Sequence, residues 1–291
     1  MHGLGNTLKT TVLLAGLGGV LVVVGGLFGR GGALIGLGLG LVMVGGSYWF
    51  SDKLAIRAAG AVEVTERQEP EYHAIVRELA DRAGMPMPRL YISPDAQPNA
   101  FATGRNPRHA AVCVNQGMLP PTFSWDELRG VLAHELGHVA NRDILVGSVA
   151  AALAVGVTSL AQMLQFAAIF GGFGRSDDDD RQNPVALLAT VILAPVAAML
   201  LQMALSRGRE FGADRFGARL IGDGEPLARA LGKLEAGAAR IPSPVDPAHA
   251  QAYIVNPLSG RRVTFKRLFL THPPTEERVR RLRAQEWAAP R

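Results

Sequence analysis

The sequence predicts an α-helical integral membrane protein, with four transmembrane helices in two hairpins and a mainly α-helical α+β domain that carries a small β-sheet. Three observations support this fold class. The 291 residues are 48% hydrophobic and only 19% charged. The mean hydropathy is +0.16, which is too apolar for an ordinary soluble domain. Four long runs contain no charged residue, and segments with helix or strand patterns lie between and after them.

The first two charge-free runs, residues 10–29 and 31–51, are 20 and 21 residues long and are separated by Arg30. Each is about 30 Å long as a helix, which is enough to cross the hydrocarbon core. The second run follows immediately and no small-residue cleavage site lies between them, so we expect a retained anchor rather than a signal peptide. Residues 144–174 and 182–206 predict a second hairpin around an aspartate-rich loop.

Basic residues flank the predicted spans unequally. More basic residues lie on the side of the bilayer that holds the termini than in the two short turns on the other side. Basic residues favour the cytoplasmic side, so we expect the termini in the cytoplasm. This group consists of Lys9, Lys53, Arg57, Arg142, Arg207 and Arg209. We therefore expect an N-terminal transmembrane hairpin over 1–51, a first half of the cytoplasmic domain over 52–143, a second hairpin over 144–206 and a second half of the domain over 207–291.

The hydrophilic segments contain the elements of this domain. An amphipathic helix is predicted by one apolar face that consists of Tyr72, Ile75, Val76, Leu79 and Ala83. Three strand-like segments separated by turn residues follow, and we expect a small meander of 89–93, 99–103 and 109–115. The C-terminal segment predicts three helices, at 208–222, 225–240 and 274–287, with a proline-containing loop over 241–260.

The string HELGH at 134–138 is the most informative motif in the sequence. Two histidines four residues apart on a helix project from the same face, so His134 and His138 can bind one Zn²⁺ ion. Glu135 beside them can then take a proton from a water molecule on the ion. Ser124 and Glu127 form a capping box that predicts the start of this helix. A cysteine-rich zinc module is excluded, because Cys113 is the one cysteine in the chain.

A catalytic zinc of this type needs a third protein ligand. The metzincin pattern is excluded, because Asn141 and Ile144 stand where that pattern requires glycine and histidine. Glu210, just after the last predicted span, is a candidate ligand, and the alternative is a solvated charge among the arginines of its helix. Asp214 lies one turn further on the same face and could accept a hydrogen bond from a histidine ring.

Four strings in this order resemble the HtpX-type membrane zinc metalloproteases, which are relatives of the CAAX prenyl proteases. They are NAFATG at 99–104, HELGHVANRD at 134–143, REFGAD at 209–214 and LTHPPTEERVRRL at 270–282. The resemblance covers most of the chain and implies a zincin-like protease domain with one Zn²⁺ per chain. It further implies roles for His134, His138 and Glu210 as zinc ligands, for Glu135 as the catalytic base and for Asp214 as a carboxylate that supports a ligand.

The same resemblance implies that His272, in a His-Pro motif near the C-terminus, polarises the substrate carbonyl. The alternative is that His272 is a neighbour of the N-cap of a helix that begins with proline. A sequence-indifferent way to hold an extended substrate is backbone pairing with an edge strand. By position, and by similarity to zincin edge strands, 99–103 and 110–115 are candidates, and Asn99 is the residue expected to bind substrate.

The sequence thus predicts a membrane-bound zinc endopeptidase. The resemblance implies cleavage of misfolded or damaged proteins at the bacterial cytoplasmic membrane, within a stress response. The alternatives are a specific prenyl-peptide or processing protease and a catalytically silent membrane scaffold, and the intact Glu135 argues against the scaffold. We expect protein or peptide substrates and the lipid bilayer as partners. Nucleic acid is not expected, because the net charge of +5 is explained by basic residues that flank the spans.

Overall fold

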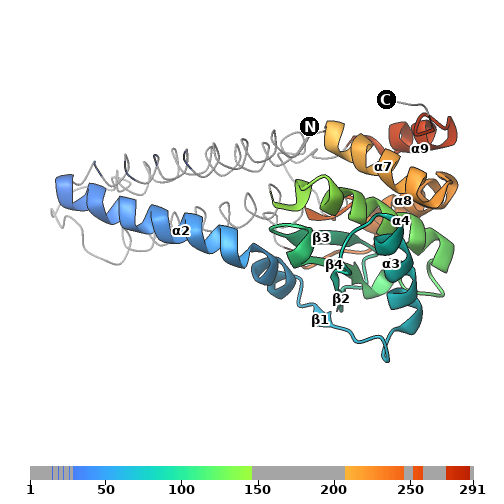
Figure 1. The fold of residues 1–291 in the computed structure, drawn as a ribbon, viewed down its shortest axis with the longest axis horizontal. Coiled ribbons are helices and arrows are strands. Elements are labelled where there is room, and N and C mark those ends of the chain that lie inside the picture. Colours follow the sequence, from blue (N-terminus) through green and yellow to red (C-terminus); the bar gives the residue numbers. More distant parts are fainter. Residues whose placement is uncertain are drawn as a thin grey trace, which may run out of the picture.

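The computed structural model describes residues 29–145, 207–245, 252–257 and 273–288, with a few isolated positions before residue 29 (Figure 1). Most of the predicted span 10–29 lies outside these residues, as do the predicted span 182–206 and nearly all of the run 144–174. Within the described part, one long helix extends away from a domain that contains the sheet and the other helices (Figure 1).

The long helix α2 spans Gly29–Ala58 and includes the second predicted span. It continues past the end of the charge-free run, and its first acidic residue, Asp52, is paired with Arg89 of the sheet, Nη2 to Oδ2 at 2.7 Å. No single described helix has the length and hydropathy needed to cross a membrane. Taken together, the segments Ala33–Met43 and Tyr48–Ala58 have them, and these two meet at an angle of 68°.

The sheet has four strands in the order β1-β2-β4-β3, with β1 at Val62–Glu63, β2 at Arg89–Ser93, β3 at Ala100–Gly104 and β4 at Ala110–Asn115. The predicted meander is wrong, because β4 lies between β2 and β3 and runs parallel to β2. All six residues of β4 are buried, as expected for a central strand covered on both faces. This order leaves β3 at one edge of the sheet.

Side chains from neighbouring strands alternate between two cores. Leu90, Val112 and Val114 belong to the larger core, which the helices of the domain share. Tyr91, Phe101 and Cys113 face a smaller core on the opposite side, where Ala55 and Ile56 of α2 pack against them. The C-terminal end of α2 is therefore packed against the sheet, and this contact fixes the orientation of α2 relative to the domain.

The larger core lies among five helices. Their bounds are α3 at Pro70–Arg82, α4 at Trp125–Ala140, α7 at Arg207–Ile221, α8 at Glu225–Arg240 and α9 at Thr275–Arg283. Helix α4 lies in the middle, with α7 and α8 packed along it (Figure 1). Leu132 of α4 is fully buried, and truncating such a side chain to alanine costs about 2–5 kcal/mol. The HELGH helix is therefore firmly packed within the domain.

Candidate metal centre

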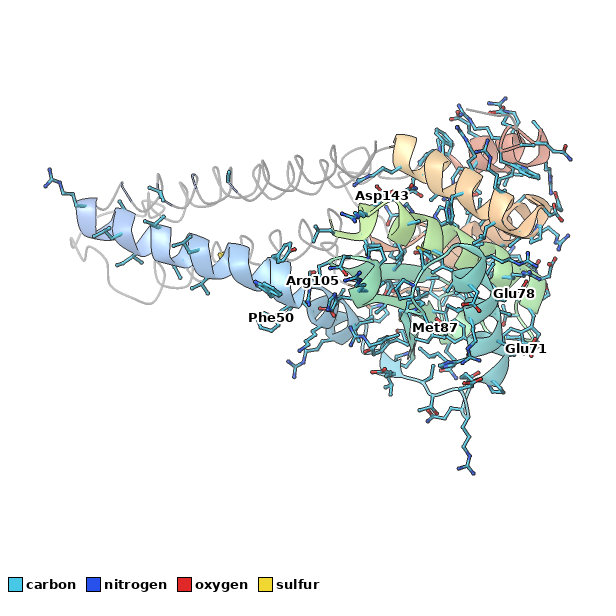
Figure 2. The ribbon with its side chains drawn as sticks, in the orientation of Figure 1. Phe50, Glu71, Glu78, Met87, Arg105 and Asp143 are labelled. Carbon is cyan, nitrogen blue, oxygen red and sulfur yellow. The ribbon has the colours of Figure 1, made fainter. Side chains whose placement is uncertain are left out.

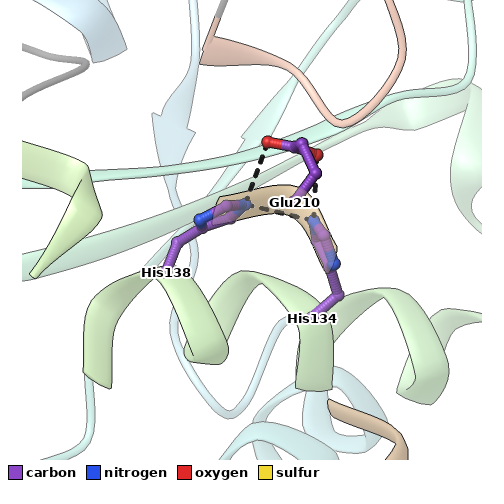
Figure 3. Close-up of side chains that lie close together, drawn as sticks. All are labelled: His134, His138 and Glu210. Atoms are coloured by element: carbon purple, nitrogen blue, oxygen red, sulfur yellow. Dashed lines mark hydrogen bonds and ion pairs between the residues drawn. The ribbon is translucent and has the colours of Figure 1, made fainter. Parts of the chain in front are cut away.

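Helix α4 presents both histidines of the HELGH motif. Its start is fixed by a capping box, in which Ser124 Oγ accepts from the backbone N–H of Glu127 while Glu127 accepts from that of Ser124. His134 is completely buried and His138 is partly buried. The Nε2 atoms of the two rings lie 3.2 Å apart, so both rings are directed at one point in space (Figure 3).

Helix α7 supplies the third group at this point. Glu210, in its first turn, is mostly buried. Its Oε1 lies 3.6 Å from Nε2 of His138, and its Oε2 lies 3.9 Å from Nε2 of His134 (Figure 3). The alternative of a solvated helix charge does not describe Glu210, because its side chain lies between α7 and the two histidine rings.

One atom from each of His134, His138 and Glu210 lies within 4.8 Å of the other two, so these residues can hold a metal ion. Two imidazole nitrogens and a carboxylate oxygen are a donor set that Zn²⁺ accepts. A tetrahedral zinc ion with ligands at about 2.1 Å separates its ligand atoms by about 3.4 Å. The separations of 3.2, 3.6 and 3.9 Å are close to that value, so the residues fit the ion.

Glu135 is buried beside the cluster, and its carboxylate accepts a hydrogen bond from the backbone N–H of Ala102 in β3. Its Oε1 atom has no hydrogen-bond partner within the described residues. Burial raises the pKa of Glu135 to about 7, and the negative charge of Glu210 adds to the effect. Such a carboxyl group exchanges a proton readily near neutral pH, which is what a general base requires.

Each histidine is oriented by a carboxylate. Asp214 Oδ1 lies 2.9 Å from Nδ1 of His134, and Asp143 Oδ2 lies 3.3 Å from Nδ1 of His138. A hydrogen bond at Nδ1 leaves the lone pair on Nε2, the atom directed at the metal position. Burial lowers the pKa of His134 to about 4. Burial opposes protonation of His138 as well, but Asp143 and Glu210 outweigh it and raise its pKa to about 9, so cation binding there displaces a proton.

Arg278 of α9 lies against this site, although it is not among the residues that the sequence predicted for it. Arg278 is only 1% exposed, and it donates to both oxygens of Asp214 and to the carbonyl oxygen of Ile254. Its Nη1 is also 3.6 Å from Glu210 Oε2. The signal in the sequence was its spacing of four from the buried Leu282, which places Arg278 on the apolar face of the helix.

The sequence also did not predict Asp143 as a partner of His138, because Asp143 follows the end of the predicted helix. Its signal was the distance of five residues from His138, which is short enough to fold back beside that ring at the helix end. Figure 2 shows Asp143 at the end of α4 that lies toward α2.

The sequence also predicted His272 and Asn99 for the site. His272 lies outside the described residues, and its role stays a prediction. Asn99 is completely buried next to β3, where its Nδ2 donates to the carbonyl oxygen of Val255 and its Oδ1 accepts from the backbone N–H of Val255. Substrate can reach this side chain only after the segment 252–257 moves, so substrate binding by Asn99 also stays a prediction.

The sequence and the fold have clear relatives. Residues 66–286 match the model of peptidase family M48. The chain is 53% identical to a "Protease HtpX homolog" from Syntrophotalea carbinolica, over 95% of this chain and 98% of the relative. A homologue of the same name from Pelotomaculum thermopropionicum is 48% identical over 96% and 99% of the two chains. The crystal structure of S. mikatae Ste24p shares the fold, with a TM-score of 0.51, 19% identity and coverage of 96% of this chain and 66% of that one.

Proposed function

The chain belongs to peptidase family M48, and on that premise we propose that it is a membrane-embedded zinc endopeptidase that cleaves misfolded or damaged membrane proteins on the cytoplasmic side. The family makes it a metallopeptidase. The observation that supports the proposed reaction is the convergence of His134, His138 and Glu210 within 4.8 Å beside the buried carboxylate of Glu135. This is the arrangement of a site that holds a metal next to a general base.

The proposed roles follow from the positions of the side chains. His134, His138 and Glu210 would hold the zinc ion. When bound, the ion would act as a Lewis acid toward a peptide carbonyl and lower the pKa of a water molecule. Glu135 accepts the proton of the attacking water and later returns a proton to the leaving amine, for which its unpaired Oε1 is available. Asp214 and Asp143 keep both histidine rings in the tautomer that a cation requires.

The edge strand β3 is the proposed support for the substrate backbone. The N–H of Ile254 already donates to the carbonyl oxygen of Ala100, so the start of this edge is covered by the segment 252–257. The rest of the strand, toward Gly104, lies beside Glu135, since Ala102 bonds to that carboxylate. An extended peptide paired there would place a scissile bond next to the metal cluster with little dependence on its sequence.

We place the protein in the bacterial cytoplasmic membrane with four spans, of which the second lies in α2. Large apolar side chains on α2 support this placement, because Leu34, Ile35 and Val42 are 70%, 66% and 72% exposed. Both halves of the domain, 52–143 and 207–291, would then lie in the cytoplasm between and after the hairpins 1–51 and 144–206. This arrangement puts the metal cluster near the membrane surface, where loops of membrane proteins are within reach.

Cleavage of an unfolded model protein tests the proposed reaction. Detergent-purified wild type should cut casein, a metal chelator should abolish cleavage, and Glu135→Gln should lose cleavage while it keeps about one zinc per chain. Glu71→Gln, an exposed position on α3, is the matched control and should cut like wild type. If wild type binds zinc and cuts neither casein nor membrane-protein substrates, the silent scaffold becomes the better description. A requirement for a lipidated C-terminus would instead indicate the specific processing protease.

Membrane sidedness can be tested with introduced cysteines, because the native Cys113 is completely buried. A Glu71→Cys variant in intact spheroplasts should resist a membrane-impermeant thiol reagent and should react after the membrane is opened. Labelling in intact spheroplasts would place the domain on the periplasmic side and contradict the proposal. Extraction of the protein from membranes by alkaline carbonate would contradict the membrane embedding itself.

A further inference from the structure

The last part of α2, Tyr48–Ala58, has two different faces. Asp52, Ala55 and Ile56 face the sheet, and the last two belong to the smaller core. A second set of side chains adjoins this face, recurs every three to four residues and is exposed to solvent. It consists of Trp49, Phe50, Lys53, Leu54 and Arg57. Exposed aromatic and aliphatic side chains mixed with basic ones are typical of a helix that lies in the headgroup region of a membrane.

A cavity of about 320 Å³ opens at the junction of this helix with the sheet. Its walls include three basic side chains, one carboxylate, a tyrosine and an aliphatic residue: Lys53, Arg57, Arg89, Asp52, Tyr91 and Ile56. Three positive charges and one negative charge leave this lining with a net charge of +2. A cavity with this lining is suited to an anion that offers several oxygen acceptors.

Arg89 is held in place within this cavity. Its Nη2 donates to Asp52 Oδ2 at 2.7 Å, and its Nη1 donates to the hydroxyl oxygen of Tyr91 at 3.0 Å. The Tyr91 hydroxyl in turn donates to Glu63 Oε2 at 3.0 Å. Asp52 is thereby compensated by Arg89, so the excess positive charge comes from the two basic residues of α2. Neither Lys53 nor Arg57 forms an ion pair within the described part of the chain.

Further groups at the junction indicate where the anion comes from. The guanidinium carbon of Arg105 lies 4.9 Å from the centre of the Trp49 ring, so the domain adds another cation at this level of α2. Figure 2 shows Phe50 and Arg105 close to the point where α2 reaches the domain. Phe50 is 52% and Leu54 is 45% exposed beside Lys53. A soluble anion would leave these apolar side chains in water, whereas the acyl chains of a lipid would cover them.

We propose that this cavity binds the phosphate of an anionic phospholipid headgroup, with Lys53 and Arg57 as its principal ligands and Arg89 as a preoriented third. The inference rests on the membrane embedding in the proposed function and assigns a lipid site distinct from the metal centre. The bound headgroup would fix the C-terminal end of α2 at the bilayer surface. Because that end packs against β3 and β4, it would also fix the height of the domain above the membrane.

Native mass spectrometry of the full chain in neutral detergent tests this site. The probes are phosphatidylglycerol and phosphatidylcholine with matched acyl chains, supplied in equal amounts at low salt. Wild type should retain one phosphatidylglycerol per chain in preference to phosphatidylcholine. Lys53→Gln/Arg57→Gln should lose roughly 30-fold in that preference, as expected for two basic residues at a membrane surface. Equal retention of both lipids by wild type would overturn the proposal.

Two further variants separate a defined cavity from diffuse attraction. Arg67→Gln/Arg240→Gln removes the same charge from exposed positions elsewhere and should bind phosphatidylglycerol as wild type does. Ala61→Trp keeps all the basic groups but fills the cavity that Ala61 lines, and it should lose the single tight lipid. Unchanged lipid retention in Ala61→Trp, or an equal loss in the Arg67→Gln/Arg240→Gln control, would contradict a defined site.

Inorganic phosphate and casein complete the test. Added phosphate at the concentration of the lipid should leave phosphatidylglycerol bound, because it lacks the acyl chains that cover Phe50 and Leu54. Displacement by phosphate would show that the cavity takes a soluble anion and would overturn the lipid assignment. Casein cleavage by the same preparations distinguishes the two proposals. Active protein without lipid preference contradicts only the lipid site, whereas a selective lipid site in inactive protein contradicts only the peptidase assignment.

Discussion

Arg278 donates two hydrogen bonds to Asp214, from Nε to Oδ2 at 2.9 Å and from Nη2 to Oδ1 at 2.7 Å. Both side chains are buried, and Asp214 Oδ1 also accepts from Nδ1 of His134. Burial alone would raise the pKa of Asp214, but Arg278 and His134 outweigh it and hold that pKa at about 2. Asp214 is therefore ionised at every pH at which the enzyme is expected to work, and it can hold the ring of His134, a proposed metal ligand.

Asp214→Asn should weaken zinc binding by about 10–100-fold, because the neutral amide holds the His134 ring less firmly and makes it less basic. The measurement is a zinc titration against a competing chelator. Asp81→Asn, at an exposed position on α3, is the control and should bind zinc as wild type does. Unchanged zinc affinity in Asp214→Asn would show that the carboxylate does not support the ligand.

Arg278→Gln should lower the free energy of unfolding by about 3–5 kcal/mol, because it leaves the buried Asp214 charge without its partner. The double variant Arg278→Gln/Asp214→Asn removes both charges and should lose less than the sum of the two single variants. Unfolding is followed with chelator present, so that metal binding does not contribute. Strict additivity would mean that the two residues do not interact in solution.

Gly217→Ala should destabilise the domain by about 1–3 kcal/mol and reduce zinc affinity. A Cβ at this position would lie 2.9 Å from the backbone nitrogen of His134, so α7 must move away from α4 and take Glu210 with it. Gly212→Ala on the same helix is the matched control, because a Cβ added there would have no heavy atom within 4 Å apart from its chain neighbours and the backbone of its own helix. It should be neutral or stabilise by up to about 1 kcal/mol through helix propensity. Equal thermal unfolding of the two variants would contradict the close contact of α7 with α4.

Glu127→Gln should reduce stability at neutral pH by about 1 kcal/mol and have no effect in acid. Burial alone would raise the pKa of Glu127, but its hydrogen bonds with Lys233 and Ser124 hold that pKa below the ordinary value of 4.5. A lowered carboxyl pKa stabilises the folded state above the unfolded pKa, and this stability is lost as the pH falls through the folded pKa. Glutamine keeps the capping box, so the difference reports the ion pairs of Glu127, with Lys233 at 2.7 Å and with Arg229 at 4.0 Å.

Thermal unfolding midpoints of wild type and Glu127→Gln, measured from neutral pH downward, should therefore converge in acid. Asp126→Asn removes an exposed ion pair with Arg229 one residue away and should change stability by only a few tenths of a kcal/mol. A constant difference between wild type and Glu127→Gln at all pH values would mean that the charge of Glu127 is not what stabilises α4 against α8.

The part of the site that lies on one helix could be predicted from the sequence. His134 and His138 meet because residues four apart share a helix face, and the Ser124 and Glu127 capping box fixes where that helix begins. Each relationship involves residues only three or four positions apart, so it follows from the geometry of the helix. The strands were found for a similar reason, since alternation and turn residues are local signals.

Tertiary structure decided what depends on distant segments. The order of the strands differs from the predicted meander, because β4, whose six residues are all buried, gains most from the centre of the sheet, where both of its faces are covered. Arg278 lies 64 residues from Asp214 and 144 from His134, and no local pattern encodes which charge an arginine will neutralise. Sequence by itself determined which chemical groups the HELGH helix presents. Only the packing of α7 against this helix, and of α9 against α7 and α8, determined which distant carboxylates and which arginine complete the site, because burying a charge requires a partner that the rest of the fold brings to it.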